Sequence, residues 1–367
     1  MQKSFDEVFE DVTKLGTKIK TDEYHPLGKY QIIDQGQEKI AGYTDLKDGL
    51  FENVPAVIFG DHTRVIKYVD KPFFLGADGV KVLRSRLENA NYRYLYYALK
   101  NVKIPNTGYN RHFKWLKEAQ INYPSVETQF EIVSTLDGVT SIIEHRQQQL
   151  QKLDELVKAR FVEMFGDSEF NTMQWPTKKL SEICAVSSSK RIYQNELSTE
   201  GVPFLRISDL NERIDNVKNA PELFIPINKY NELKENGLVP TEGDILVTSR
   251  GTLGRCYIVR PEDEFYFQDG MISWLSDLNS QITSVYLSQL FAMSGIQKQI
   301  ASLQAGSTVA YLSITMLKKL NIMLPPLDRQ EQFAAFVEQT DKSKVVVQKA
   351  LDEAQTLFDS LMQEYFG

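Results

Sequence analysis

Two stretches of the chain carry apolar residues at every seventh position. In residues 124–166 these positions hold Leu136, Ile143, Leu150, Val157 and Met164. In residues 325–367 the same frame holds Val337, Leu351, Phe358 and Tyr365. This spacing places one apolar stripe along an α-helix and is typical of helices that pack on another helix. We therefore predict two long helices, with these side chains in the contact between them.

The two stretches are copies of one another in a single register. At an offset of 201 residues, 43 positions align without a gap and 8 are identical. In the first copy the identical residues are Pro124, Gln129, Gln147, Leu150, Leu156, Glu163, Phe165 and Gly166. Proline at the start and glycine at the end suit the two ends of a helix. Identity at both ends of one register indicates a duplication rather than two unrelated surface helices. Arg146, Arg160 and Lys344 interrupt the apolar stripe.

The segments before the two predicted helices have a different pattern. Short apolar runs such as VPAVIF (residues 54–59) and DILVT (residues 244–248) alternate with glycine-containing loops, which predicts strands in mixed α/β domains. Landmarks recur in the same order, including YRYLYYAL (92–99) beside VYLSQLFA (285–292). We predict an α+β chain in four parts: domain 1–123, helix 124–166, domain 167–324 and helix 325–367.

Composition and charge leave a soluble globular protein as the expectation. Hydrophobic residues make up 42% and charged residues 25% of the 367 residues, and no apolar run is long enough to span a membrane. With two cysteines and no signal peptide, we expect a reduced, cytoplasmic protein. The net charge of −7 resides in the two predicted helices, which hold 7 acids with 4 bases and 8 acids with 4 bases. Bulk charge therefore does not exclude a nucleic-acid partner.

Residues that could carry catalysis are scattered along the chain. The four histidines show no metal-binding spacing, and Cys184 and Cys256 have no CxxC partner. No phosphate-binding loop and no GxGxxG turn after a strand occurs. The LPPL tract at 324–327 resembles a methyltransferase proline pair, but a helix-entry role explains it better. We expect no catalytic residue, no bound cofactor and no metal site in this chain.

Signals for binding DNA are concentrated in loops that mix basic, hydroxyl, amide and aromatic side chains. These residue types reach phosphates and base edges. The candidates are His62, Thr63, Arg64, Tyr109, Asn110 and Arg111 in the first domain, and Lys190, Arg191, Tyr193, Arg206, Ser249, Arg250, Thr252, Arg255, Gln304, Ser307 and Thr308 in the second. For any single residue, a solvated surface turn is the alternative interpretation.

The strongest single candidate is the loop TSRGTLGR at residues 248–255. Gly251 and Gly254 permit positive φ and a close approach of the backbone to a ligand. Arg250 and Arg255 each offer a planar fork of donors that fits a guanine edge or a phosphate. We predict that this loop contacts DNA and that Arg250 reads a base.

The repeated helix starts (PxxxxQ), helix ends (ExFG) and preceding glycine loops together resemble the specificity subunit of Type I restriction–modification systems. The tracts KLDELVKARFVEMFGD and LPPLDRQEQFAAFVEQTD, and TVAYLSITMLKKL before the second, are similar to that family's conserved regions. The resemblance covers essentially the whole chain. It implies two target-recognition domains that each read one half of a bipartite target in double-stranded DNA. It also implies an antiparallel coiled coil of the two helices, with a pseudo-two-fold repeat.

The resemblance further implies partners that carry the chemistry. Two modification subunits would bind S-adenosylmethionine and methylate adenine, and restriction subunits would use Mg²⁺ and ATP. No base-contacting residue can be transferred, because the recognition domains of this family vary. Three alternatives remain open at this stage: a specificity subunit of a methylation-only complex, a self-sufficient DNA methyltransferase or nuclease, and a coiled-coil scaffold with peptide-binding ends.

Overall fold

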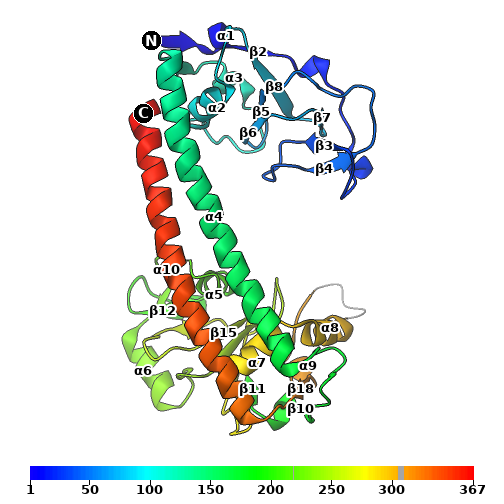
Figure 1. The fold of residues 1–367 in the computed structure, drawn as a ribbon. Coiled ribbons are helices and arrows are strands. Elements are labelled where there is room, and N and C mark those ends of the chain that lie inside the picture. The colour runs from blue at the N-terminus through cyan, green and yellow to red at the C-terminus, as the bar shows by residue number, and fades with distance from the viewer. Residues whose placement is uncertain (218, 305–309) are drawn as a thin grey trace. The chain divides into compact units, whose positions relative to one another are not determined.

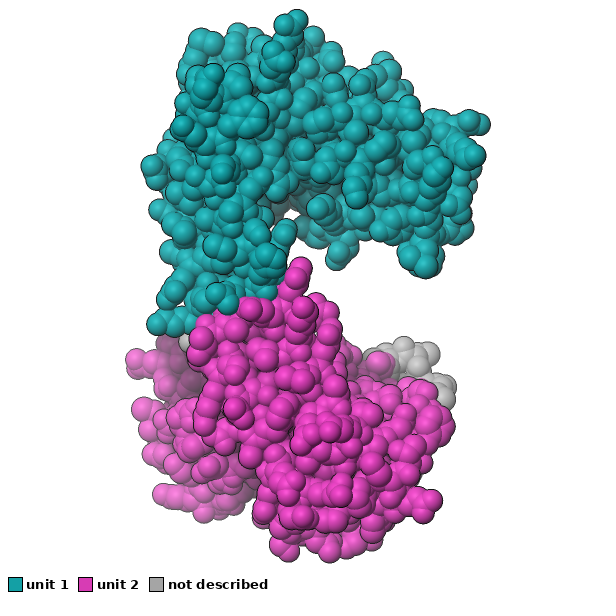
Figure 2. Space-filling model, in the orientation of Figure 1, with its two compact units in different colours: residues 1–147, 348–367 teal, residues 148–347 magenta. Residues whose placement is uncertain are grey.

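The computed structural model describes residues 1–217, 219–304 and 310–367. The chain divides into two compact units, drawn in different colours in Figure 2. Unit 1 comprises residues 1–147 and 348–367, and unit 2 comprises residues 148–347. Both units mix helices with strands, as predicted. Within the described ranges, no helix is long and apolar enough to cross a membrane.

Two long helices, α4 (Val126–Phe165) and α10 (Leu327–Phe366), each contain 40 residues and contribute to both units (Figure 1). In unit 1, Leu136 of α4 and Phe358 of α10 belong to one hydrophobic cluster. In unit 2, the rings of Phe161 of α4 and Phe333 of α10 lie 5.5 Å apart. The first part of α4 therefore packs with the last part of α10, and the reverse holds in unit 2. In each unit the two helices are antiparallel.

The side chains predicted for the helix contact all lie at least partly covered. Leu136, Val157, Met164, Val337 and Phe358 are buried, and Ile143, Leu150, Leu351 and Tyr365 are partly buried. Polar residues on the stripe are accommodated by partners. The ammonium of Lys344 lies 2.8 Å from the carboxylate of Asp154, and the guanidinium of Arg160 lies 5.8 Å from the ring centre of Phe336. These contacts offset the cost of placing charge in a half-buried contact.

Unit 1 contains three small sheets. Its strands are β1 (Gln2–Ser4), β2 (Phe9–Asp11), β3 (Tyr30–Ile33), β4 (Gly42–Thr44), β5 (Ala56–Gly60), β6 (Ile66–Val69), β7 (Phe73–Leu75), β8 (Val80–Ser85) and β9 (Gln120–Asn122). The sheet orders are β2-β8-β5-β6, β4-β3-β7 and β1-β9. Its shorter helices are α1 (Phe5–Val8), α2 (Tyr92–Lys100) and α3 (Phe113–Leu116), with 3₁₀ turns at Thr13–Leu15 and Thr21–Glu23. All of β5 is buried, because it lies between β8 and β6 in the sheet.

Unit 2 repeats this plan. Its strands are β10 (Thr177–Lys179), β11 (Ala185–Ser187), β12 (Val202–Leu205), β13 (Phe224–Ile225), β14 (Ile245–Thr248), β15 (Cys256–Ile258), β16 (Tyr266–Phe267), β17 (Ile272–Ser276) and β18 (Asn321–Met323). The sheet orders are β11-β17-β14-β15, β13-β12-β16 and β10-β18. Strand for strand, β10–β18 therefore make the same pairings as β1–β9.

The remaining helices of unit 2 are α5 (Ile207–Ile214), α6 (Ile227–Glu235), α7 (Ser284–Phe291), α8 (Ser294–Leu303) and α9 (Ile314–Lys318), with 3₁₀ turns at Leu180–Glu182 and Gln194–Glu196. By position, α7 corresponds to α2 and α9 to α3. Among the described residues, α5, α6 and α8 have no counterpart in unit 1. The two units thus share one frame, and unit 2 adds three helices to it.

Equivalent tyrosine hydroxyl bonds define how α2 and α7 correspond. The hydroxyl of Tyr94 donates to the backbone oxygen of Asn122 at 2.6 Å, and that of Tyr286 donates to the backbone oxygen of Met323 at 3.1 Å. Tyr94 therefore matches Tyr286, and α2 and α7 occupy the same place in their units.

The repeated glutamine near each helix start locks the entry to the helix. Gln129 and Gln330 are fully buried. The amide of Gln129 donates to the backbone oxygen of Pro124 at 3.1 Å, and that of Gln330 donates to the backbone oxygen of Pro325 at 2.9 Å. The PxxxxQ spacing is thus a structural motif, which supports the helix-entry interpretation of the prolines.

Candidate nucleic-acid interface

The turn between β14 and β15 is held in one conformation by Thr248. Its hydroxyl donates to the backbone oxygen of Thr252 at 2.6 Å and accepts from the backbone N–H of Arg255 at 2.9 Å. Gly251 and Gly254 have φ of 69° and 75°, a region that glycine enters without strain. The predicted loop is therefore a rigid turn at the end of a buried strand. The side chain of Thr252 is exposed on it.

Arg250 projects from this turn. Its backbone pairs with that of Tyr311, and its guanidinium carbon lies 5.5 Å from the centre of the Tyr311 ring. Arg250 is exposed, and none of the described residues forms an ion pair with it. An arginine that is oriented by an aromatic face but has no anionic partner keeps its donors available.

Two other residues of the same loop are not available, contrary to expectation. Ser249 is 1% exposed, and its hydroxyl hydrogen-bonds that of Ser273 at 2.8 Å. It is covered because β14 lies between β17 and β15, and the residue after the strand is still inside. Arg255 donates to the side chain of Asn211 at 2.8 Å and also bonds both carboxylate oxygens of Asp215. Its fork is occupied by an acid 40 residues away in sequence, which no local pattern indicates.

The loop after β11 lies beside this turn. The hydroxyls of Ser188 and Ser189 donate to the backbone oxygens of Ile272 and Phe267, at 2.8 and 2.7 Å. The backbone N–H of Ser249 donates to the backbone oxygen of Met271 at 2.9 Å. These bonds link residues 188–193, 248–252 and 268–271, together with Tyr311, into one surface that we call the unit 2 loop surface.

The basic and aromatic candidates of residues 188–193 are displayed on the unit 2 loop surface to different degrees. Lys190 and Tyr193 are exposed. Arg191 is also exposed, but its Nε donates to the carboxylate of Asp269 at 2.9 Å. Arg206, at the start of α5, bonds Asp209 and Glu222, and these two acids raise its pKa. Arg206 thus balances local acids instead of offering a free donor fork.

Gln304 has a structural role as well. Its amide nitrogen donates to the backbone oxygen of Tyr311 at 2.6 Å, and its amide oxygen accepts from the backbone N–H of Tyr311 at 2.9 Å. Gln304 thereby fixes the residue whose ring lies under Arg250. The other two candidates of this tract, Ser307 and Thr308, lie outside the described residues.

In unit 1 the equivalent turn, between β5 and β6, presents different side chains. The ring of His62 stacks on that of Tyr109, with centres 4.6 Å apart and planes 5° apart. Tyr109 is 87% exposed, and Arg111 is exposed beside it. The sequence candidates of residues 62–64 and 109–111, which are 45 or more residues apart, are thus brought together.

The remaining candidates of unit 1 support this turn. The Thr63 hydroxyl donates to the backbone oxygen of Gln35 at 2.6 Å. Arg64 adopts φ of 63° and donates to the backbone oxygen of Ile104 at 3.3 Å. The amide of Asn110 donates to the backbone oxygen of Thr107. His62, Tyr109 and Arg111 therefore remain as the displayed side chains.

Each unit has an ion pair at the same place in its fold, and our sequence analysis did not predict either pair. In unit 1, Lys18 lies 2.7 Å from Asp78, in the turn between β7 and β8. In unit 2, Arg191 pairs with Asp269, in the equivalent turn between β16 and β17. The bond from Lys18 holds the pKa of Asp78 below its usual value, and Arg111 and His62 lower it further. The repeated tracts FFLGADG and FYFQDG contain both acids and could have indicated them.

Both turns are built on the same backbone connections. In unit 1, the N–H of Asp61 donates to the backbone oxygen of Gly79 at 2.7 Å, and the oxygen of Asp61 accepts from His112 at 2.8 Å. In unit 2, Ser249 makes the same two contacts with Met271 and Leu312, at 2.9 and 3.0 Å. One frame therefore presents His62 and Arg111 in one unit and Arg250 and Tyr311 in the other, and in unit 1 Tyr109 stacks on His62.

In the part of the chain that the structure describes, possible metal ligands do not gather at either turn. Burial raises the pKa of the Cys184 thiol to about 12 and also raises that of Cys256. Among the residues that the structure describes, no group of three or more histidine, cysteine, aspartate or glutamate side chains could hold a metal ion. The loops around the two turns instead carry arginine, lysine, histidine and tyrosine side chains.

Comparisons with known proteins identify relatives of this chain. A specificity subunit of the MjaIX type I restriction enzyme from Methanocaldococcus jannaschii is 24% identical over 267 residues, which are 67% of this chain and 60% of that protein. A candidate type I specificity subunit from Haemophilus influenzae is 27% identical over 263 residues, which are 68% of this chain and 64% of that protein. The chain therefore matches less than two thirds of the length of these relatives.

A solved structure shares the fold along the whole chain. The S subunit of a Type I restriction–modification system from M. genitalium superposes with a TM-score of 0.58 at 18% identity, covering 100% of this chain and 96% of that one. The family model of the Type I restriction modification DNA specificity domain matches residues 2–155 and 173–354. These two ranges contain most of unit 1, of unit 2 and of both long helices, and on that ground the chain belongs to the Type I restriction modification DNA specificity domain family.

Proposed function

We propose that this chain is the DNA sequence-recognition subunit of a Type I restriction–modification complex and has no catalytic role of its own. Residues 1–123 and 167–324 act as target-recognition domains, and residues 124–166 and 325–367 act as spacer helices related by a pseudo-two-fold repeat. The observation that carries this proposal is the repeated turn frame: the same backbone contacts present His62 and Arg111 in one domain and Arg250 and Tyr311 in the other. Two copies of one frame with different side chains suit two different half-sites.

The proposal assigns the chemistry to partner chains in the cytoplasm. Two modification subunits would dock on the spacer helices and bring S-adenosylmethionine, and restriction subunits would bring Mg²⁺ and ATP. The acidic surface of the helices, which carry 15 acids and 8 bases between residues 124–166 and 325–367, keeps them away from phosphate and suits a protein partner. A complex that methylates without a nuclease would use the chain in the same way.

Exchanging one domain tests modular recognition. Residues 167–324 are replaced by the corresponding domain of a relative, and the hybrid is expressed with its modification subunits. Methylome sequencing should show one half of the methylated motif changed and the other half retained. The reciprocal exchange of residues 1–123 is the matched control and should change the other half. If both halves change in either hybrid, the two domains do not read independently.

The spacer role has its own test. One heptad is inserted between Glu144 and Leu153 of α4, and one at the corresponding place in α10, because the helices pack along each other in both units. Seven residues keep the apolar stripe in phase and add about 10 Å of helix. The preferred gap between half-sites should lengthen by about three base pairs, at ~3.4 Å each. An unchanged gap would mean that the helices do not set the spacing.

A further inference from the structure

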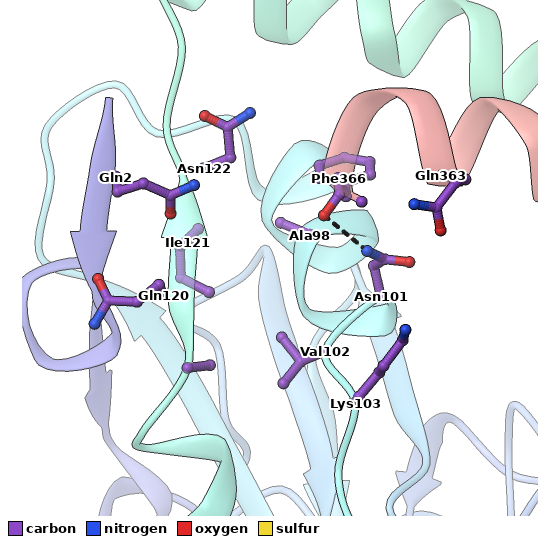
Figure 3. Close-up of a pocket in the computed structure, with 12 residues that line it drawn as sticks. Gln2, Ala98, Asn101, Val102, Lys103, Gln120, Ile121, Asn122, Gln363 and Phe366 are labelled. Carbon is purple, nitrogen blue, oxygen red and sulfur yellow. Dashed lines mark hydrogen bonds between the residues drawn. The ribbon is translucent and has the colours of Figure 1, made fainter.

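Unit 1 contains a pocket of about 330 Å³ beside strand β9 (Figure 3). Strand β9 forms one wall, and the end of α10 with the residues that follow α2 forms the other. Its lining includes Asn101, Lys103, Gln120, Asn122 and Phe366. The side chain of Asn101 closes one side by donating to the backbone oxygen of Phe366 at 2.9 Å.

The pocket is bordered by an unpaired edge of β9. On its other edge β9 pairs with β1, where Tyr123 donates to Met1 and Phe5 donates to Ala119. Because bonded and non-bonded positions alternate along an antiparallel pair, the backbone N–H and C=O of Gln120 point away from β1. Among the described residues, neither group has a hydrogen-bond partner. An open donor and acceptor at a strand edge are a template for another polypeptide.

In unit 2 the same edge is covered by a helix of the chain itself. Asn321 of β18 is the counterpart of Gln120 of β9, at the same offset of 201 residues that relates the two long helices. The side chain of Gln299 on α8 accepts from the backbone N–H of Asn321 at 2.8 Å and donates to its backbone oxygen at 3.1 Å. One amide side chain thus satisfies both groups that are open in unit 1.

Helix α8 is held in that place by the segment that follows α4. Lys298 of α8 pairs with Glu169 at 2.6 Å, and the backbone N–H of Gly295 donates to the Ser168 hydroxyl at 3.1 Å. Unit 1 contains the equivalent strand β9, the equivalent end of a long helix, and Tyr94, whose hydroxyl bonds that strand. Among the described residues of unit 1, no helix corresponds to α8. The pocket lies where unit 2 has its own covering helix.

The charge of the pocket lining indicates which kind of partner segment can bind there. Lys103 is its one charged lining side chain, it is exposed, and no described residue forms an ion pair with it. We propose that this pocket binds a short helical segment of a partner polypeptide, which directs a glutamine or asparagine amide to the backbone of Gln120 and carries a carboxylate near Lys103. This contact goes beyond DNA recognition and would distinguish unit 1 from unit 2 in an assembly.

The test uses the full chain and helix-stabilised peptides with the sequence of residues 294–303, because that segment covers the equivalent edge. The parent peptide carries Lys298, and a second peptide carries Lys298→Glu. Fluorescence anisotropy should show saturable binding of both in the micromolar range, with the acidic peptide about fivefold tighter because of Lys103. Gln299→Leu in the acidic peptide should weaken binding at least about tenfold, since it leaves both Gln120 groups unpaired.

Variants of the chain make the test decisive. Lys103→Glu should reverse the preference, so that the parent peptide binds more tightly than the acidic one, whereas Lys319→Glu in unit 2 should leave the preference unchanged. The side chains of Lys103 and Lys319 are both exposed, so neither substitution changes a buried residue. The proposal is overturned if neither peptide saturates at millimolar concentration, or if binding ignores both Gln299 and Lys103. It is also overturned if duplex DNA competes with the peptide, which would assign the pocket to the DNA surface.

Discussion

The guanidinium carbon of Arg250 lies 5.5 Å from the centre of the Tyr311 ring, and the backbones of the two residues pair. The aromatic face orients the arginine without neutralising it. If Arg250 reads a base, Arg250→Ala should cost about 1–3 kcal/mol in binding and relax the preference at one position of one half-site. If it contacts only phosphate, all sequences should weaken alike and the salt slope should fall by about one.

The measurement for Arg250 is binding of the assembled complex to single-base variants of its target at two salt concentrations. Lys234→Ala on α6 is the control, because Lys234 is exposed and lies outside the unit 2 loop surface. Wild-type affinity and base preference in the Arg250→Ala protein would remove this loop from the interface.

Arg255 should behave differently although it belongs to the same loop. Its guanidinium is bonded to Asn211 and Asp215, so Arg255→Ala removes a contact that ties the turn to α5. Because the pair is partly exposed, with side-chain exposures of 28% and 54%, we expect a loss of about 1 kcal/mol in the free energy of unfolding. Urea denaturation measures the loss. A protein of unchanged stability but altered base preference would contradict the structural role.

The equivalent ion pairs of Arg191 with Asp269 and of Lys18 with Asp78 should limit non-specific DNA binding. Each carboxylate competes with phosphate for the same cation. Asp269→Asn should therefore raise affinity for random duplex DNA and steepen the salt dependence by about 0.9, the value for one added phosphate contact. Asp78→Asn should do the same through Lys18. Competition binding with random duplex at several salt concentrations checks both, and weaker binding by either variant would exclude this role.

Tyr94 and Tyr286 should make comparable contributions to the stability of their own units. Each buried hydroxyl donates to the last strand of the two-stranded sheet, and burial raises the pKa of both. Tyr94→Phe leaves the partly buried backbone oxygen of Asn122 without its donor, and Tyr286→Phe does the same to the buried oxygen of Met323, each of which costs about 1–3 kcal/mol. Tyr193→Phe is the control, since Tyr193 is 61% exposed, and should change stability by less than about 0.5 kcal/mol. Thermal or urea unfolding gives the comparison.

The ionised carboxylate of Asp209 should contribute to the free energy of unfolding only at pH values above the acid range. Burial alone would raise its pKa, but the bonds from Arg206 outweigh burial, and the pKa is lowered from 3.8. A carboxyl with a lower pKa in the folded state stabilises the fold above its unfolded value of 3.8, and this contribution is lost as the pH falls through the folded value. Urea unfolding near pH 5 and pH 3 should show a smaller pH dependence for Asp209→Asn than for wild type. Glu235→Gln, on the exposed side of α6, should retain the wild-type dependence.

The sequence could predict the candidate interface only where the residues that bond each candidate side chain lie close to it in the sequence. The display of Arg250 and Tyr109 could be predicted because basic and aromatic residues in glycine-containing loops form a local pattern, whereas their contact with DNA stays a prediction. Arg255 was misjudged because its partners, Asn211 on α5 and Asp215 directly after that helix, lie about 40 residues earlier. The same limit hid the pairing of Lys18 with Asp78, whose two residues are 60 positions apart. A local pattern shows which side chains can bind, but not which are already bonded.

The sequence by itself determined the two long helices, their 201-residue register and the alternation of helices with mixed domains, because apolar periodicity and duplicated helix ends are local properties of the chain. Only the tertiary structure decided that Ser249 is buried while Arg250 is displayed, since burial depends on which strands flank β14. It also decided that Gln299 covers the edge of β18 while Gln120 remains open on β9. Hydrogen bonds between distant segments set these differences, and they arise only when the folded backbone brings those segments together.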